Sequence, residues 1–373
     1  MLTDETQQTD FPALAGMTYL NTAAESIPPT CVTEALAQYA RDKGLGMRGR
    51  GPHNETLAKC REVAARMVGL QTDEVAFCSC SSEAYNLLAS ALNLGTDDEV
   101  VITDLDFPAG ATPWLNAAAP PKVNLWKAKD GALDANNLPA LLNDRTRLVQ
   151  VSLVSFFNGH RLDWAPFIAA VREHAPRAKV AVDVTQALGR VELDCADFDV
   201  LISSTHKWVL GVHGGCIVGI PNKENDITTH AGGWYHLQNA FDADRFERAV
   251  PKQGAASFSV GMPNYAAIYA LNAALRYIEN VGVANIAAHA NPLVAQLEAG
   301  LRELGLAPMA AQREGNFSGI LAIRHERSEA LHAALEAAEV HVMNHAGRLR
   351  MALHGYNTVA DVEKFLSVLK STL

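Results

Sequence analysis

The stretch ISSTHKWVLGVHGG, residues 202–215, decides the fold and the chemistry of this chain. It begins as a β-branched, apolar strand and runs through three hydroxyl side chains and His206 to Lys207. A lysine ammonium is strongly hydrated, yet Lys207 is followed at once by the apolar segment that starts at Trp208. A solvated surface lysine rarely has such neighbours. The pattern therefore predicts a buried lysine at the end of a strand, with a chemical function.

The strand within 202–215 is one of several short apolar runs that alternate with helical patterns. The apolar runs are residues 74–78, 99–103, 122–126, 147–155, 179–184, 198–203 and 215–220. Helical patterns lie between some of them, at 81–92, 107–118 and 163–175. This alternation predicts βα units in a mostly parallel sheet that is covered by helices on both faces.

The pattern of apolar residues changes after about residue 260. Two alanine- and leucine-rich helical patterns follow, and weaker strands and a last helix complete the chain: 264–282, 285–304, 318–323, 348–353 and 361–370. We predict an α/β protein with a large domain over 16–260 and a smaller α+β domain over 261–373. The segment 1–15 is expected to pack near the smaller domain.

Composition excludes several classes of function. The chain has 373 residues, of which 49% are hydrophobic, and 31 basic against 41 acidic residues give a net charge of −10. Without a basic run, nucleic-acid binding is not expected. No long apolar run and no signal-like N-terminus are present, so we expect a cytoplasmic protein that does not enter a membrane. Six scattered cysteines predict neither a disulfide framework nor a metal site.

Polar side chains follow the strands where an open parallel sheet binds its ligands, at the carboxyl ends. Ser81 and Ser82 open a helix after the first run, Phe107 follows the second, and Asp183 ends the fifth. Taken singly, each has an ordinary structural explanation. The serines could cap a helix, Asp183 could cap a turn, Phe107 could pack in a core, and His206 could be a hydrogen-bonded structural residue.

Taken together, these residues match the needs of one cofactor. Pyridoxal phosphate requires a lysine for a Schiff base, a carboxylate that keeps the pyridine nitrogen protonated, a phosphate cradle and a flat group against the ring. The candidates are, in that order, Lys207; Asp183; Ser82 with Ser204 and His206; and Phe107. Burial favours the neutral amine that imine chemistry needs. Lys207, released when substrate binds, is then expected to act as general acid and base at the substrate α-carbon.

With these residues, the chain resembles the class V aminotransferase family of fold-type-I pyridoxal-phosphate enzymes. This family includes cysteine desulfurases, isopenicillin-N-epimerase-like proteins and kynureninase. The resemblance rests on four segments that span nearly the whole chain: TYLNTAAESIPP (18–29), the aspartate-x-x-glutamine of 183–186, the serine-x-histidine-lysine of 204–207, and LRMALHGYNTVADVEKF (349–365).

The resemblance implies roles for particular residues and a homodimer whose active sites lie at the subunit interface. It implies the Schiff base on Lys207, the pyridine-nitrogen contact from Asp183 and ring stacking by Phe107. It implies a hydrogen bond from Gln186 to the ring hydroxyl, and an α-carboxylate contact from Arg350. The phosphate contacts that it implies come from Ser81, Ser82, Ser204 and His206.

Three departures from the family pattern bear on the reaction, and one further stretch, 44–54, is a candidate loop. No cysteine follows Cys216, so a persulfide-type desulfurase is not expected. Met262 replaces the family's threonine that reaches the partner's phosphate, which puts that contact in doubt. Phe156 holds the register of an asparagine near the ring hydroxyl, with Asn158 two residues on. The glycine-broken stretch 44–54 is expected to be a loop, either at the substrate entrance or as a solvated turn.

The sequence thus predicts a pyridoxal-phosphate enzyme that acts at the α-carbon of an amino acid, with amino-group transfer as the conservative assignment. An isopenicillin-N-epimerase-like epimerase and a cysteine-conjugate β-lyase remain alternatives, because all three reactions use the same lysine, aspartate and arginine. A non-catalytic scaffold is the alternative from another class. Met262 motivates the scaffold, and the retained Lys207, Asp183 and Arg350 argue against it.

Overall fold

A computed structural model describes residues 1–222, 227–312 and 316–373 of the chain. Its helices are α1 Asp4–Asp10, α2 Thr30–Lys43, α3 Arg50–Val68, α4 Ser81–Leu92, α5 Pro108–Leu115, α6 Trp164–His174, α7 Tyr265–Val281, α8 Val283–Glu303, α9 Ser328–Ala337 and α10 Val359–Thr372. Its strands are β1 Thr18–Tyr19, β2 Val75–Cys78, β3 Glu99–Thr103, β4 Lys122–Trp126, β5 Thr146–Ser152, β6 Lys179–Asp183, β7 Val200–Ser204, β8 Cys216–Gly219, β9 Ile320–Arg324, β10 Val340–His341, β11 Met343–His345 and β12 Arg348–Ala352.

The seven apolar runs of the sequence form one sheet, in the order β2-β8-β7-β6-β5-β3-β4. Neighbouring strands are parallel from β7 through β6, β5 and β3 to β4, whereas β8 is antiparallel to both β7 and β2. The predicted mostly parallel α/β fold is confirmed. Because β2, β3, β6 and β7 run in the same direction, the residues that follow them meet at one edge of the sheet.

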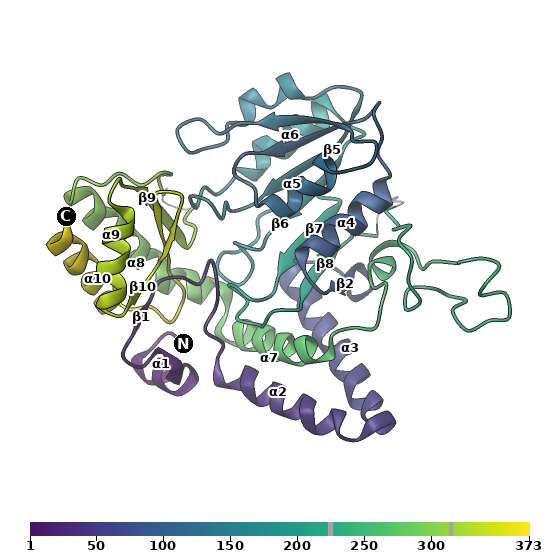
Figure 1. Cartoon of the computed structure of the whole chain (residues 1–373), viewed down its shortest axis with the longest axis horizontal. Helices are drawn as coiled ribbons and strands as arrows, with labels where there is room; N and C mark the ends of the chain where they lie inside the picture. The colour runs from purple at the N-terminus through teal and green to yellow at the C-terminus, as the bar shows by residue number, and fades with distance from the viewer. Residues whose placement is uncertain (223–226, 313–315) are drawn as a thin grey trace.

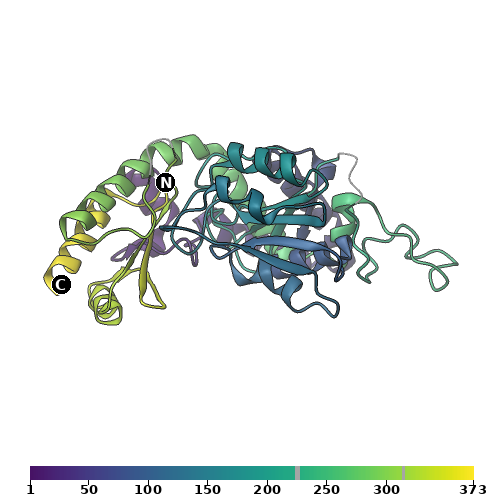
Figure 2. The same ribbon diagram turned by 90° about the horizontal axis from the view of Figure 1, so that it is seen from above.

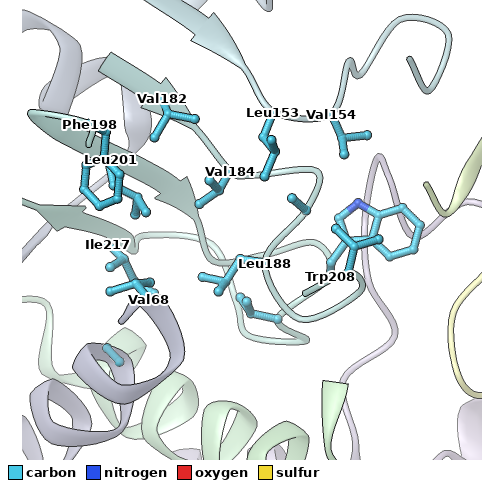
Figure 3. Close-up of a cluster of buried hydrophobic side chains, with 14 of the residues drawn as sticks. Val68, Leu153, Val154, Val182, Val184, Leu188, Phe198, Leu201, Trp208 and Ile217 are labelled. Carbon is cyan, nitrogen blue, oxygen red and sulfur yellow. The ribbon is translucent and has the colours of Figure 1, made fainter. Parts of the chain in front are cut away.

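Helices cover both faces of this sheet (Figures 1 and 2). Along a strand, successive side chains point to opposite faces. Ala181 accordingly packs in a cluster with α4 and α5, whereas Val182 packs in a cluster with α3, α6 and α7. Figure 3 shows part of the second cluster, which contains Val182, Val184, Leu188 and the buried indole of Trp208. The residue after Lys207 is thus anchored in the main core.

A second, three-stranded antiparallel sheet has the order β11-β12-β9. One of its faces packs on α8, α9 and α10, and Leu349 and Met351 of β12 lie in that apolar cluster. Alternation along β12 turns Arg348 and Arg350 to the other face. This second sheet therefore presents arginines on the face that does not pack on its own helices.

The predicted boundary between the two domains stays a proposal. Helix α7 packs against α2 and α3, and its buried Ile268 and Leu275 join the core on one face of the large sheet. These contacts favour a boundary after α7, near residue 282, over one at residue 260.

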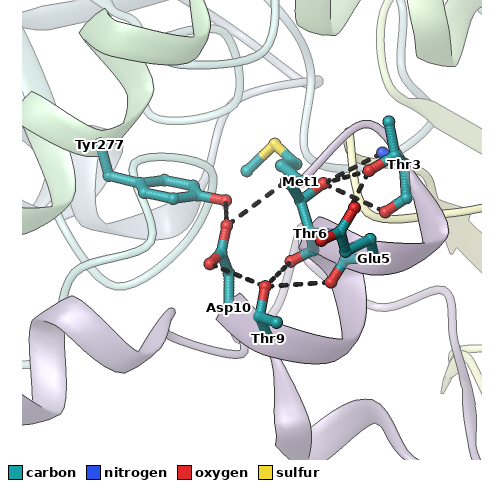
Figure 4. Close-up of polar contacts among 7 residues, drawn as sticks. All are labelled: Met1, Thr3, Glu5, Thr6, Thr9, Asp10 and Tyr277. Carbon is teal, nitrogen blue, oxygen red and sulfur yellow. Dashed lines mark hydrogen bonds and ion pairs between the residues drawn. The ribbon is translucent and has the colours of Figure 1, made fainter.

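The N-terminal segment links the two sheets. Strand β1 pairs in parallel with β10. Figure 4 shows the carboxylate of Asp10 at the end of α1, where it accepts a hydrogen bond from the Tyr277 hydroxyl of α7 at 2.6 Å. The N-terminal ammonium of Met1 lies 3.5 Å from the same carboxylate. Gln7 also donates to the Tyr356 carbonyl at 2.6 Å, so the segment contacts both α7 and the C-terminal region.

The prediction of a loop over 44–54 was wrong, because most of this stretch is helical. Residues Gly46–Gly49 form a 3-10 helix, and α3 begins at Arg50. Gly49 lies so close to the carbonyl of Asp42 that a Cβ would clash with it. His53 is buried and stacks on Tyr265 with ring centroids 4.9 Å apart. Gly49 therefore permits close packing of α2 on α3, in a stretch where the sequence had indicated a loop.

Candidate active site

A cavity of about 140 Å³ lies at the carboxyl edge of the large sheet. Most of the residues predicted to bind the cofactor line it: Ser81, Phe107, Asp183, Gln186, Ser204, His206 and Lys207. They come from the ends of β2, β3, β6 and β7, which explains how positions distant in sequence meet. The structure thus brings together the set that the sequence singled out, with one exception.

That exception is Ser82, which is exposed and does not line the cavity. Ser81 is the first residue of α4, and each helical residue is rotated by about 100° from the one before it. When Ser81 faces the cavity, Ser82 therefore turns toward solvent. The phosphate contact expected from Ser82 stays a prediction.

Lys207 lies over the aromatic face of Phe107, with Nζ 5.5 Å from the ring centroid. Within the described ranges its ammonium makes no ion pair. Burial, which is opposed by the charge of Asp183 and assisted by that of Arg350, lowers the pKa of Lys207 to about 8. A substantial neutral fraction near physiological pH makes this amine a competent nucleophile.

Asp183 is held in one orientation by two donors. The hydroxyl of Tyr85 donates to Oδ2 at 2.7 Å, and the backbone N–H of Thr185 donates to Oδ1 at 2.7 Å. Sequence reasoning missed both partners. Tyr85 lies four residues after Ser81 on α4, so helical spacing could have placed the two side chains on one face of the helix. The two donors fix the position of the carboxylate in the cavity.

A second buried carboxyl group, Asp106, lies close to Asp183. Burial raises the pKa of Asp106 to about 7, and the negative charge of Asp183 contributes to the shift. The backbone N–H of Ser152 donates to it at 2.8 Å. Asp106 follows strand β3, and no role was assigned to it from the sequence. A partly protonated Asp106 reduces the repulsion that a second full charge would exert on Asp183.

His206 is held as a neutral imidazole. Burial lowers its pKa to about 4, and the neighbouring Lys207 and His213 lower it as well. Its ring stacks on His213 with centroids 4.4 Å apart, and His213 in turn contacts Glu25 at 3.1 Å. With Ser81 and Ser204, His206 forms the polar end of the cavity where a phosphate is expected. It would act there by hydrogen bonding and not by charge.

The segment 18–29, which carries part of the family resemblance, lies beside this site. Its Ala23 carbonyl accepts a hydrogen bond from the amide nitrogen of Gln186 at 3.0 Å, and the Gln186 amide oxygen accepts one from the Trp208 indole at 2.6 Å. Ser26 donates through its backbone N–H to the His206 carbonyl at 3.0 Å. Gln186 thus ties the segment to the lysine loop, and its contact with a ring hydroxyl stays a prediction.

Phe156 and Asn158, the two candidates for the family's asparagine position, lie in different surroundings. Phe156 lines the cavity, and its ring lies 5.0 Å from that of Phe107. Asn158 instead donates to the Gly131 carbonyl at 2.7 Å and accepts from the N–H of His160 at 3.0 Å. Asn158 therefore stabilises a loop, and an aromatic ring occupies the place where the family has a polar amide.

Arg350 approaches the cavity from β12 of the second sheet. It is 1% exposed, and its Nη1 donates to the Phe156 carbonyl at 2.7 Å. Its Nε and Nη2 are buried and have no hydrogen-bond partner among the residues that the structure describes. Burial lowers the pKa of Arg350 to about 10, so it remains a cation at neutral pH. Arg350 does not itself line the cavity, but Phe156, to which it donates, does. Its free Nε and Nη2 suit a carboxylate, which accepts two parallel hydrogen bonds.

These groups fit pyridoxal phosphate. The cavity offers an amine, a fixed carboxylate, a ring-stacking phenylalanine and hydroxyl donors at a helix N-terminus. Among the described residues no group of three histidine, cysteine, aspartate or glutamate side chains could hold a metal ion. Within the same ranges no helix is long and apolar enough to cross a membrane.

The parallel sheet, its helical layers and the lysine-centred cavity define the chain as a fold-type-I pyridoxal-phosphate protein. More specifically, the Aminotransferase class-V family model matches residues 18–365, and the chain belongs to that family. The resemblance noted from the sequence is thereby confirmed, and pyridoxal phosphate is the cofactor that membership and the cavity residues indicate.

Relatives with curated descriptions carry more than one activity in their names. The chain is 29% identical over 363 residues to an uncharacterized aminotransferase, YcbU, of Bacillus subtilis, covering 94% of this chain and 93% of the relative. It is also 29% identical over 327 residues to a cysteine desulfurase of Cronobacter sakazakii, covering 81% and 77%. Since some relatives are named cysteine desulfurases, the relatives do not support our expectation that this chain is not a persulfide-type desulfurase.

Solved structures share the fold at lower identity. A cystine C–S lyase, C-DES, in complex with cysteine persulfide has a TM-score of 0.88 at 20% identity, covering 97% of this chain and 99% of that one. The apo cysteine desulfurase of Thermococcus onnurineus has a TM-score of 0.85 at 22% identity, covering 100% and 98%. At these identities the similarity establishes the fold and leaves the reaction open.

Proposed function

We propose that this protein is a pyridoxal-phosphate enzyme that acts at the α-carbon of an amino acid and transfers its amino group. One observation carries the proposal: the amine of Lys207, with its pKa lowered to about 8, lies in a cavity with the fixed carboxylate of Asp183 and within the field of the unpaired guanidinium of Arg350. These are the groups that the chemistry requires, and they approach from three separate elements.

Each side chain has a distinct task in this proposal. The bound cofactor supplies an electron-withdrawing ring. Asp183 holds a proton at the ring nitrogen, and Lys207 first anchors the cofactor and then moves a proton at the substrate α-carbon. Arg350 binds the substrate carboxylate and so fixes which bond of the α-carbon faces the ring. Phe107, whose ring faces the Lys207 amine, would stack on the cofactor ring.

Epimerisation and β-elimination remain the alternatives, since they use the same three groups. The fold shared with a cystine C–S lyase keeps elimination under consideration. A persulfide-type desulfurase is not proposed, because the chain has no cysteine between Cys216 and its last residue, Leu373. Cys80 is exposed, but it precedes α4 on the phosphate side of the cavity, away from Arg350.

The products of the reaction test this proposal. Purified holoenzyme would be incubated with an amino acid and a 2-oxo acid in deuterated water. Amino-group transfer predicts a new amino acid together with the 2-oxo acid of the donor. Deuterium at the α-carbon with racemisation would identify an epimerase, and pyruvate from a cysteine conjugate would identify a lyase. A colourless protein that takes up no cofactor would support the scaffold and contradict the proposal.

The lowered pKa of Lys207 predicts how cofactor attachment depends on pH. Only the neutral amine attacks the cofactor aldehyde, so the rate of attachment to cofactor-free protein should rise with pH and level off above about 8. The same shift means that the unfolded chain holds the extra proton between pH 8 and the ordinary value of 10.5. The free energy of unfolding of cofactor-free protein should therefore rise with pH across that window. Hydride trapping of the adduct measures the rate, and a midpoint near 10.5 would contradict the assignment.

We also propose a homodimer and keep the cytoplasm as the expected location. Figures 1 and 2 show the segment around residues 232–251 as an arm that projects from the large domain. On it Trp234, Phe241 and Phe246 are 43%, 82% and 89% exposed, and Met262 beyond it is 42% exposed. Apolar side chains exposed to this degree are typical of a surface that another subunit covers. A fully active monomer in sedimentation would contradict this proposal.

A further inference from the structure

A second buried arginine lies next to the one assigned to the α-carboxylate. Arg348 and Arg350 are two residues apart on β12, so both side chains leave the same face of the strand. Their Cα atoms are separated by about 7 Å, twice the rise per residue of a strand. The face opposite is apolar and packs in the helical layer of the smaller domain through Leu349 and Met351. The two arginines therefore form a pair directed away from that core.

Arg348 has no anionic partner in the part of the chain that the structure describes. It is 1% exposed, and its Nε and Nη1 are buried without a hydrogen-bond partner. Its guanidinium carbon lies 4.0 Å from the ring centroid of Phe157. Such a cation–π contact contributes about 0.5–2 kcal/mol, which offsets only part of the cost of burying an unpaired charge. A bound anion would supply the counterion that the buried Arg348 guanidinium lacks.

The surroundings of Arg348 strengthen its positive field. Arg324 of β9 is its register partner, and the Arg324 guanidinium lies 5.8 Å from the same Phe157 ring. Burial, together with the charge of Arg324, lowers the pKa of Arg348. His345 is its register partner on β11. No aspartate or glutamate within the described ranges pairs with Arg324 or Arg348.

Arg348 is also close to the active site. Phe157, on which it lies, follows Phe156, whose ring lines the cavity and whose carbonyl binds Arg350. The rings of Phe156 and Phe157 are 6.2 Å apart. The charge of Arg348 also contributes to the lowered pKa of Arg350, so the two guanidinium groups lie near one another. A substrate held by Arg350 at its α-carboxylate would therefore lie near a second cation.

We propose that Arg348 forms a second anion subsite, and that the enzyme acts on amino acids with a carboxylate at the end of the side chain, of the length of aspartate or glutamate. Arg350 binds the α-carboxylate and Arg348 binds the distal one. Two guanidinium groups on one face of a strand suit a four- or five-carbon diacid, because each can bind one of two carboxylates that a short chain connects. This inference rests on the proposed function, and it names the substrate class of that site.

The test compares acidic and neutral substrates of equal length in the holoenzyme. We expect kcat/KM for L-glutamate to exceed that for L-norvaline by about 10- to 100-fold, the range of a hydrogen bond to a charged group. Arg348→Met should reduce this ratio to near one and leave kcat/KM for L-norvaline within about three-fold. Arg348→Lys, which keeps the charge, should restore part of the preference. Arg302→Met, an exposed arginine of α8 in the same domain, is the matched control.

A binding measurement separates this inference from the proposed function. Calorimetry on cofactor-free protein should show glutarate binding more tightly than butyrate, with the difference lost in Arg348→Met. If the protein takes up no cofactor, the proposed function fails while the glutarate result still reports on Arg348. Equal affinity for glutarate and butyrate, or a glutamate preference that survives in folded Arg348→Met, would overturn the inference. If Arg348 instead pairs with a carboxylate of a second subunit, glutarate and butyrate should bind with equal affinity.

Discussion

Lys207→Ala is expected to abolish covalent attachment of the cofactor and to lower turnover by about 10³- to 10⁴-fold. The wild-type protein should be yellow, and its visible band should be absent or shifted in the variant, because the bond to Nζ no longer forms. The same atom is the group that moves the proton at the α-carbon. Both functions are therefore lost together, and the loss in kcat should exceed any change in KM.

Spectroscopy and peptide mapping measure the first effect, and single-turnover kinetics measure the second. Hydride reduction of native holoenzyme should place the adduct on the peptide that contains Lys207. Lys370→Ala, an exposed lysine on α10, is the control and should behave as wild type. A variant at position 207 that keeps the band and its turnover would show that another amine carries the cofactor.

The sequence predicted the site well where backbone topology alone brings residues together. Asp183 and Ser204 end neighbouring parallel strands, so their meeting follows from strand direction. Phe107 and Ser81 reach the same edge for the same reason. The order of the strands and the position of β8 depend on sheet pairing, which no local pattern encodes. The fold class was therefore predictable, and the pairing came only from the structure.

What the sequence could not predict depends on side-chain direction and on contacts across the fold. Ser82 is adjacent to Ser81, yet a single step along α4 turns it to solvent. One partner of Asp183 is Tyr85 on α4, and this contact requires that helix to lie on the sheet. Arg348 was not singled out from the sequence, because burial without a counterion is a property of the tertiary structure.

Asp183→Asn is the second substitution with a large expected effect. It removes the negative charge and keeps the size of the side chain, so the fold should be unaffected. Without the carboxylate, the pyridine nitrogen loses the partner that keeps it protonated, and the ring withdraws electrons less strongly. We expect kcat to fall by about 10²- to 10³-fold, the usual cost of losing one electrostatic group in an active site. The cofactor should still attach to Lys207, which separates this variant from Lys207→Ala.

Tyr85→Phe supplies a graded comparison, because it removes only the hydrogen bond that holds Oδ2 of Asp183. Its effect on kcat should be about 10-fold, in the range of a hydrogen bond to a charged group. In the double variant the Tyr85 substitution should add little, since its hydroxyl acts through the carboxylate that is already gone. Full additivity would mean that Tyr85 acts independently of Asp183. Unchanged kcat in Asp183→Asn would mean that the ring nitrogen is protonated by another group, with Asp106 as the nearest candidate.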